Sequence, residues 1–331
     1  MLSFDMDIIS KINRLNRSQL AVPAIREDFF EKAAKSNSDV VFLDLEDSVS
    51  IKNKKRAREL AVQAINDIDW GKKTISVRVN AFDTEFFRED IKFIFENSNE
   101  RLDLIMIPKS ERLDDILEIN RLVSVIETKK RKKKKIGFEL IIETALGLIN
   151  IEKLAMSTDR VESLHFGSAD LAASMGAKTT SIGGVNKNYG ILEKTNGKKN
   201  KTNNFYLNDM WHYALFKIVL TARAYGLRAI DCPYGDFTDN EGFINIATNT
   251  YSLGFEGKMV IHPQQVELAN KVYSPSALEI EEATNIIKAM KEAEAEGKGA
   301  IAINGKLLDI VSIKQAKNIL NIANKIAEGK E

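Results

Sequence analysis

Short apolar runs alternate along the chain with segments in which apolar residues recur at helical spacing. The runs are rich in Val and Ile and end in polar or turn-forming residues, as buried parallel strands do. The segments between them, such as NKKRARELAVQAIND and ERLDDILEINRLVSVIE, carry the pattern of amphipathic helices. We therefore predict strands at residues 18–24, 39–47, 73–80, 103–109, 136–144, 161–170, 227–236 and 256–263.

This alternation predicts an α/β fold in which eight parallel strands close into a (β/α)8 barrel, the TIM barrel. An open, doubly wound sheet is the alternative, but it rarely needs eight such units in succession. We expect the barrel to occupy residues 1–275 as the catalytic domain. Residues 276–331 contain a charged helix and a tail that a barrel does not need for closure. We expect them to form a C-terminal helical extension and lid, over their own barrel or a neighbour's.

Polar residues gather at the carboxyl ends of the predicted strands. In a barrel these ends form one rim, where active sites are built. An exposed charge is usually a solvated loop residue, but polar groups at so many strand ends indicate a shared cavity. A long insertion at residues 171–208 follows the sixth strand and suits a lid or a substrate-binding element. The rim residues are Arg26, Asp44, Glu46, Asp47, Arg78, Asn80, Lys109, Glu143, Asp170, Asp231, Asp236 and His262.

The composition argues against several classes of protein. In 331 residues, 44% of them hydrophobic, the charges nearly cancel to +1, so no overall field selects nucleic acid or a membrane surface. Cys232 is the single cysteine, which excludes an intramolecular disulfide and indicates a reducing compartment. No apolar run has the length of a membrane span, and the N-terminus lacks the features of a signal peptide. We expect a cytoplasmic protein that binds neither nucleic acid nor membrane.

The basic run KKRKKKK, residues 129–135, is a feature that could suggest nucleic-acid binding. It precedes the fifth strand, so it belongs to the amino-terminal end of the barrel, opposite the rim. It also lacks the interleaved aromatic residues on which bases stack. A solvated turn explains it better.

Glu143 and Asp170 form the most informative pair of carboxylates. They end consecutive strands and should lie side by side, where two carboxylates repel unless a proton or a cation lies between them. Oxygen ligands without Cys or His suit Mg²⁺, which takes one or two carboxylates and leaves its other positions to water and substrate. The small residues around Asp170, in GSADLAAS, leave room for such an ion. The alternative for Asp170 is a helix N-cap, and spacing alone does not separate the two.

Arg78 lies in VRVN, where a buried strand is expected. A buried guanidinium needs an anionic partner, and its planar fork suits a carboxylate or an enolate-like oxygen. The alternative is an internal salt bridge to DLED on the preceding strand, and the residues alone leave both open. Neither a Walker motif nor a dinucleotide-binding glycine pattern is present in the sequence, and no Cys–His or Ser–His arrangement at the rim supports a covalent nucleophile.

Taken together, these segments resemble the HpcH/HpaI aldolase and citrate lyase β-subunit-like family of barrels. The resemblance runs from RSQLAVPA to GKLLDIVSIKQAKN and covers most of the chain. FLDLEDSV, VRVN, IPK and IETALGL carry the resemblance to the family in general. GSADLAASMGAKTTSIGG and AIDCPYGDF point to the branch of the family that cleaves malyl-CoA.

The resemblance implies roles for four residues. Glu143 and Asp170 would bind Mg²⁺, for which Mn²⁺ is a possible substitute, and Arg78 would bind substrate and stabilise the enolate oxygen. Asp309, in GKLLD, matches an acid/base that a neighbouring subunit's tail supplies, although spacing alone favours a cap of the following helix. Further contacts with substrate or CoA are expected from Arg17, Arg26, Asp44, Glu46, Asp47, Lys109, Gly167, Ser168, Ala169, Ile261, His262 and Pro263.

The implied reaction is the Mg²⁺-dependent, reversible carbon–carbon cleavage of malyl-CoA to acetyl-CoA and glyoxylate, and also of β-methylmalyl-CoA to propionyl-CoA and glyoxylate. The implied assembly is a homotrimer or homohexamer in which a neighbour's tail completes each active site. A citramalyl-CoA lyase or a malyl-CoA thioesterase is the alternative within the family, because the shape of the acyl pocket decides between them. A non-catalytic CoA-binding or assembly subunit is the alternative from another class, but it would need none of the four residues above.

Overall fold

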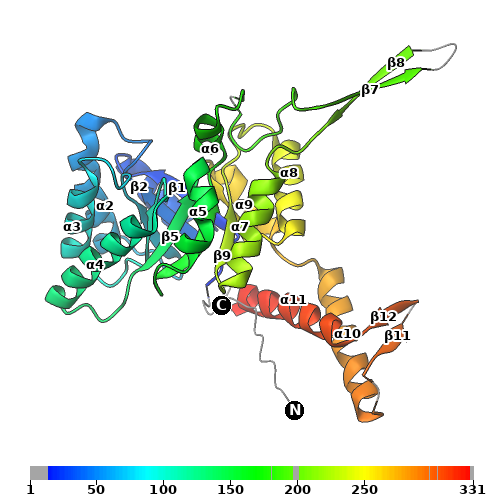
Figure 1. Ribbon diagram of the computed structural model, residues 1–331. Helices are drawn as coiled ribbons and strands as arrows, with labels where there is room; N and C mark the ends of the chain where they lie inside the picture. Colours follow the sequence, from blue (N-terminus) through cyan, green and yellow to red (C-terminus); the bar gives the residue numbers. More distant parts are fainter. Residues whose placement is uncertain (1–13, 180, 197–200, 298, 304, 329–331) are drawn as a thin grey trace.

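The computed structural model describes residues 14–179, 181–196, 201–297, 299–303 and 305–328. Eight parallel strands close into a barrel in the order β1-β10-β9-β6-β5-β4-β3-β2, and β10 pairs with β1 to complete the ring (Figure 1). Each strand falls within one of the predicted runs, so the predicted (β/α)8 barrel is confirmed. The strands are β1 (Ser18–Pro23), β2 (Val40–Asp44), β3 (Thr74–Arg78), β4 (Leu104–Ile107), β5 (Gly137–Ile142), β6 (Val161–Phe166), β9 (Arg228–Asp231) and β10 (Gly257–Val260).

Helices connect the strands and cover the outside of the barrel (Figure 1). Alternate strand residues such as Leu43 and Val77 pack in the layer beneath the helices, whereas Phe42, Met106 and Ile141 form a separate cluster inside the barrel. Because both faces of each strand are buried, the strands read as continuous apolar runs. The helices are α1 (Glu27–Ala34), η1 (Ile51–Asn53), α2 (Lys54–Asp67), α3 (Phe87–Asn97), α4 (Leu113–Lys130), α5 (Ala145–Ala155), α6 (Ser168–Met175), α7 (His212–Ala224), α8 (Asn240–Leu253) and α9 (Pro263–Val272).

Several buried polar residues inside the barrel are paired with one another. Glu139 accepts hydrogen bonds from Gln19 Nε2 at 2.8 Å and from Ser76 Oγ at 2.6 Å. Lys258 Nζ lies 2.6 Å from Asp231 Oδ2, and both side chains are buried. A buried charge requires such a partner. Asp231, expected at the rim from its place at a strand end, is therefore the internal partner of Lys258.

The insertion after β6 has more structure than its polar composition indicates. α6 forms its first part, and β7 (Gly190–Asn196) pairs with β8 (Lys201–Leu207) as an antiparallel hairpin. The hairpin projects away from the barrel at the end where α6 lies (Figure 1). Its described side chains include exposed apolar residues such as Ile191, Phe205 and Tyr206. The long insertion was predicted, but the hairpin was not.

The chain continues beyond the barrel as α10 (Ala277–Ala295), the strands β11 (Ile301–Ile303) and β12 (Lys306–Leu308), and α11 (Ile310–Glu328). α10 and α11 pack together, and Lys72 Nζ donates a hydrogen bond to the Glu328 carbonyl at 3.1 Å. Since Lys72 precedes β3, α11 ends at the amino-terminal side of the barrel, at the opposite end from α6 (Figure 1). The domain division at residues 275 and 276 stays a prediction. None of the described helices is long and apolar enough to cross a membrane.

Candidate active site

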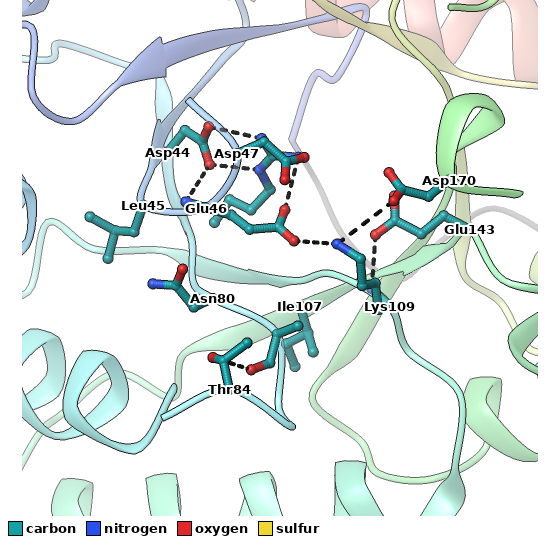
Figure 2. Close-up of polar contacts among 12 residues, drawn as sticks. Asp44, Leu45, Glu46, Asp47, Asn80, Thr84, Ile107, Lys109, Glu143 and Asp170 are labelled. Carbon is teal, nitrogen blue, oxygen red and sulfur yellow. Dashed lines mark hydrogen bonds and ion pairs between the residues drawn. The ribbon is translucent and has the colours of Figure 1, made fainter. Parts of the chain in front are cut away.

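The carboxyl ends of five consecutive strands, β2 to β6, bring charged residues together (Figure 2). Asp44 and Arg78 are the last residues of β2 and β3, and they are paired in the strand register. Because each strand is the neighbour of the next one in the chain, residues far apart in sequence converge at one edge. We call this group the rim cluster; it consists of Asp44, Glu46, Asp47, Arg78, Lys109, Glu143 and Asp170.

Arg78 and Asp44 form a bidentate ion pair. Arg78 Nε lies 2.7 Å from Asp44 Oδ1 and Nη2 lies 2.8 Å from Oδ2. Burial disfavours the charge on Asp44, but the Arg78 guanidinium outweighs that effect and holds the pKa of Asp44 below its usual value. The remaining nitrogen, Nη1, lies 3.2 Å from Glu46 Oε2 and 3.6 Å from Asp47 Oδ2. The salt bridge to DLED is therefore present, and it involves all three nitrogens of the Arg78 guanidinium.

The turn after β2 is held by a lysine that the sequence did not single out. Asp44 accepts hydrogen bonds from the backbone N–H groups of Glu46 and Ser48. Lys54, at the start of α2, is buried and donates to the carbonyl oxygens of Leu45 and Glu46, both at 2.7 Å. Residues of the DLED turn are thus fixed from both sides. The sequence shows Lys54 only as a lysine at the start of a helix. A lysine in that position is usually solvated, so nothing in the sequence indicated its buried role.

Lys109 contacts Glu46 on one side of the rim cluster and Glu143 and Asp170 on the other. Its Nζ lies 2.6 Å from Glu46 Oε1 and 3.8 Å from Asp170 Oδ1, and its backbone N–H donates to Glu143 Oε1 at 2.8 Å (Figure 2). Burial lowers the pKa of Lys109, but the Glu46 carboxylate outweighs it, and the pKa is raised overall. Lys109 is therefore charged in this position.

Glu143 is a buried carboxylate with a raised pKa. Only 5% of the residue is exposed, and burial, followed by the charge of Glu46, raises its pKa to about 7. Gly167 makes its position possible, because a Cβ on Gly167 would lie 2.5 Å from Glu143 Oε2. Gly167, expected among the substrate contacts, thus has a packing reason to be glycine.

Asp170 lies in the first turn of α6, and its side chain is 40% exposed. The N-cap of α6 is Gly167, and Asp170 makes no capping hydrogen bond there. The helix N-cap alternative for Asp170 is therefore wrong. Its carboxylate instead faces Lys109 beside Glu143 (Figure 2).

The arrangement of Glu143 and Asp170 fits a divalent cation. The donors are carboxylate oxygens, that of Glu143 buried and that of Asp170 open to solvent. Mg²⁺ is usually held by one or two carboxylates with substrate and water in its other positions. Among the described residues, no group of three or more His, Cys, Asp and Glu side chains is arranged to hold a metal. The pair matches the sparse coordination of Mg²⁺ rather than an all-protein cage.

Other expected contacts lie at the same end of the barrel. Gly167 joins β6 to α6, which begins with Ser168 and Ala169, and Ser168 Oγ accepts a hydrogen bond from the Gly183 N–H at 2.9 Å, which anchors the insertion. Residues 261–263 join β10 to α9, where the His262 ring stacks on Phe237. Arg26 follows β1 and is exposed.

Two expected residues lie away from the rim cluster. Arg17 precedes β1, at the amino-terminal end of the barrel, where its guanidinium binds Asp39 and it lines a cavity of about 1500 Å³. Asp309 lies between β12 and α11, and its Oδ1 accepts from the N–H groups of Val311 at 2.9 Å and Ser312 at 3.2 Å. Asp309 therefore caps α11, at the opposite end of the barrel from α6 (Figure 1).

Asp44→Asn is expected to lower the free energy of unfolding by about 3 kcal/mol at neutral pH, because it leaves the buried Arg78 fork without its carboxylate. The depressed pKa of Asp44 means that this stability is present above 3.8 and is lost as the pH falls through the folded-state value. The difference between variant and wild type should therefore shrink in acid. Urea unfolding at several pH values measures both effects.

Asp28→Asn is the matched control. Asp28 accepts from Arg26 Nε and Nη2, the same fork geometry, but both side chains are about half exposed. Water replaces an exposed partner readily, so this variant should unfold like the wild type. Equal destabilisation by the two substitutions would contradict the assignment of a buried, structurally important fork.

Comparisons with known proteins agree with this geometry. A family model described as HpcH/HpaI aldolase/citrate lyase matches residues 17–263. An L-malyl-CoA/β-methylmalyl-CoA lyase of Cereibacter sphaeroides is 45% identical over 314 residues, which cover 95% of this chain and 96% of the relative. A malyl-CoA/β-methylmalyl-CoA/citramalyl-CoA lyase of Chloroflexus aurantiacus is 35% identical over 291 residues, which cover 88% of this chain and 82% of the relative.

A solved structure resembles the chain at lower identity. The citrate lyase β subunit of M. tuberculosis, complexed with oxaloacetate and magnesium, is 25% identical, with a TM-score of 0.61. The match covers 80% of this chain and 99% of that subunit. A magnesium ion and an oxo acid are thus bound in a protein with the same barrel.

Proposed function

The chain belongs to the HpcH/HpaI aldolase/citrate lyase family, and we propose that it is a lyase that reversibly cleaves malyl-CoA to acetyl-CoA and glyoxylate. β-Methylmalyl-CoA, cleaved to propionyl-CoA and glyoxylate, is the second substrate. The observation that carries this proposal is the 45% identity to an L-malyl-CoA/β-methylmalyl-CoA lyase, over 95% of this chain. The rim cluster supplies the chemistry that such a reaction needs.

Glu143 and Asp170 are the residues that would hold Mg²⁺ or Mn²⁺. When bound, the ion would polarise the hydroxyl and carboxylate oxygens of the malyl group. Glu143 is fixed by the Lys109 N–H, while the exposed carboxylate of Asp170 leaves that side open to substrate. The protein thus fixes one carboxylate, that of Glu143, and leaves the other, that of Asp170, accessible to solvent and substrate. The substrate would supply the further ligands of the ion.

Arg78 would offset the charge that develops on the thioester oxygen when the carbon–carbon bond breaks. Donors fixed before the reaction stabilise such a charge without reorganisation. Asp44 holds two nitrogens of the Arg78 fork, so its position is set, and Nη1, which pairs with Glu46 and Asp47, is the nitrogen that would turn to the substrate. The pair with Asp44 therefore supports the substrate-binding role rather than competing with it.

Asp309 would protonate the enolate carbon of acetyl-CoA from a neighbouring subunit. Asp309 lies at the opposite end of its own barrel from α6, which supports an action across subunits. Side chains beside it are exposed and apolar, including Leu307, Ile310 and Val311. A homotrimer or homohexamer with tail-to-neighbour sites stays the proposed assembly.

The CoA portion would lie across the loops of the same rim. Residues 167–169 and 261–263 directly follow β6 and β10 there, and exposed Arg26 is available to an anionic group. Arg17 lies at the other end of the barrel and would reach CoA only from a different direction. The cytoplasmic location also stays a prediction, based on the cysteine content.

A citramalyl-CoA lyase is the second candidate. The 35% identity to a lyase of malyl-, β-methylmalyl- and citramalyl-CoA favours it. Substrates that differ by a methyl group are separated by pocket shape, at about 1–3 kcal/mol per group. Malyl-CoA and citramalyl-CoA can therefore both be substrates with different kcat/KM.

Purified protein with Mg²⁺ should release glyoxylate from malyl-CoA and from β-methylmalyl-CoA. Each CoA ester is supplied separately, and glyoxylate, pyruvate and free CoA are followed by separate assays. Pyruvate from citramalyl-CoA would establish the second candidate, and free CoA without an oxo acid would indicate a thioesterase. Absence of all three products from every ester would overturn the proposed activity.

A further inference from the structure

Lys109 has a rare backbone conformation for a residue with a side chain. Its φ is 47°, and among the described non-glycine residues only Arg131, at the end of α4, also has a positive φ. Such residues gather at functional sites, where the surrounding structure maintains them. Here the chain turns after β4 so that the Lys109 N–H reaches Glu143 while its ammonium reaches Glu46 (Figure 2). Lys109 therefore contacts Glu143 through its backbone and Glu46 through its side chain.

Glu46 is a third carboxylate close to the proposed metal ligands. The ammonium of Lys109 that binds Glu46 also lies 3.8 Å from Asp170 Oδ1, which places the two carboxylates on either side of one cation. Both oxygens of Glu46 face cations, because Oε1 lies 2.6 Å from Lys109 Nζ and Oε2 lies 3.2 Å from Arg78 Nη1. The described residues contain no group of three His, Cys, Asp or Glu side chains arranged for a metal. The Lys109 ammonium thus lies between Glu46 and Asp170 (Figure 2).

We propose that Lys109 is a positioning residue that binds Glu46 and so keeps this carboxylate out of the metal site of Glu143 and Asp170. The inference rests on the proposed metal site. A third carboxylate would fill a coordination position and add negative charge, and both changes oppose an anionic substrate that must bind the same ion. Lys109 therefore keeps the site open and limits its negative charge.

A direct role as a substrate cation is the competing explanation for Lys109. Its ammonium is already 2.6 Å from Glu46 and only 36% of its side chain is exposed, so Glu46 would have to release it first. The two explanations differ in what they predict for metal binding without substrate. A substrate cation leaves the relation between Glu46 and the metal unchanged, whereas a positioning residue couples them.

The test uses Mn²⁺ as the probe and needs no substrate. Metal-stripped full-length protein is titrated with Mn²⁺, and free Mn²⁺ is measured by electron paramagnetic resonance. The variants are Lys109→Met, Glu46→Gln, the double variant, and Lys109→Arg. Met keeps the length of the side chain and removes its charge, and Gln keeps the shape of Glu46.

Different effects are expected from the two single substitutions. Lys109→Met frees Glu46 to face the ion and should tighten Mn²⁺ binding by about tenfold. Glu46→Gln removes a carboxylate that Lys109 already holds away from the ion, so binding should stay within about threefold of the wild type. The double variant should also bind within about threefold of the wild type, because Lys109→Met then has no carboxylate to free, whereas additive effects would leave it about tenfold tighter. Lys109→Arg keeps the charge and should restore nearly wild-type affinity.

Two results would overturn the inference. One is unchanged or weaker Mn²⁺ binding by Lys109→Met. The other is additive behaviour in the double variant. If Lys109→Met does not fold, by circular dichroism, Lys109→Gln takes its place, and unchanged or weaker Mn²⁺ binding by Lys109→Gln overturns the inference.

The inference and the proposed activity can fail separately. The protein could show the expected pattern of Mn²⁺ affinities and yet cleave no malyl-CoA. That result would support the inference and contradict only the proposed activity. Cleavage by the wild type with Mn²⁺ affinities independent of Lys109 would overturn only the inference. A wild type that binds no Mn²⁺ would overturn the metal site and this inference with it.

Discussion

Asp170→Asn is expected to reduce malyl-CoA cleavage by about 1,000-fold while the barrel stays folded. Loss of a carboxylate ligand removes the Lewis acid, whose contribution is several kcal/mol of transition-state stabilisation. The fold should survive because Asp170 is partly exposed and caps no helix. EDTA should abolish cleavage by the wild type, and Mg²⁺ or Mn²⁺ should restore it. Steady-state kinetics and thermal unfolding followed by circular dichroism measure the two effects.

Asp159→Asn is the matched control for that experiment. Asp159 precedes β6 and is largely exposed, so it lies at the other end of the strand that Asp170 follows. Loss of charge there should leave both turnover and melting temperature unchanged. Full activity in Asp170→Asn would remove it from the metal site, and an equal loss in the control would point to a general charge effect.

Asp309→Asn is expected to lower turnover by about 100-fold or more, the usual contribution of a general acid. Asparagine is as good an N-cap as aspartate, so α11 should keep its capping hydrogen bonds to Val311 and Ser312. The melting temperature should therefore stay near that of the wild type. Asp309→Ala should lose both the acid and the cap. Full activity in Asp309→Asn would show that capping is the whole role of this residue.

Mixing the Asp170→Asn and Asp309→Ala chains tests whether the acid acts across subunits. Each variant alone lacks one part of every site. In randomly mixed oligomers, about a quarter of the sites would combine an intact metal pair with an intact tail from the neighbour. Co-expression of two differently tagged chains and purification on both tags gives the mixed species. No recovered activity in such oligomers would exclude action across subunits.

The convergence of the rim cluster was predictable from the sequence because it follows from chain order. In a parallel barrel built from consecutive strands, neighbours in sequence are neighbours in space, so the ends of β5 and β6 must place Glu143 beside Asp170. The same reasoning placed Arg78 beside DLED. It required only the apolar runs and the polar residue after each one.

Predictions that depended on local geometry succeeded less often. The capping alternative for Asp170 was wrong, since α6 begins three residues earlier than a cap at Asp170 requires. The substrate or CoA contact expected of Arg17 stays a prediction, and the structure places Arg17 before β1, where it binds Asp39 at the amino-terminal end of the barrel. A one-dimensional pattern does not show which end of a strand a flanking residue faces until the strand's limits are known.

The sequence by itself determined the barrel, the set of charged residues at its rim and the family to which the chain belongs. These follow from periodicity, chain order and motifs, which are properties of the chain alone. Only the tertiary structure decided which of these charged side chains pair with one another. The left-handed turn at Lys109, its choice of Glu46 as partner and the position of α11 at the opposite end from α6 all depend on contacts between distant segments. Such contacts are selected by packing and by the need to pair buried charges, and neither is encoded in the order of residues within one segment.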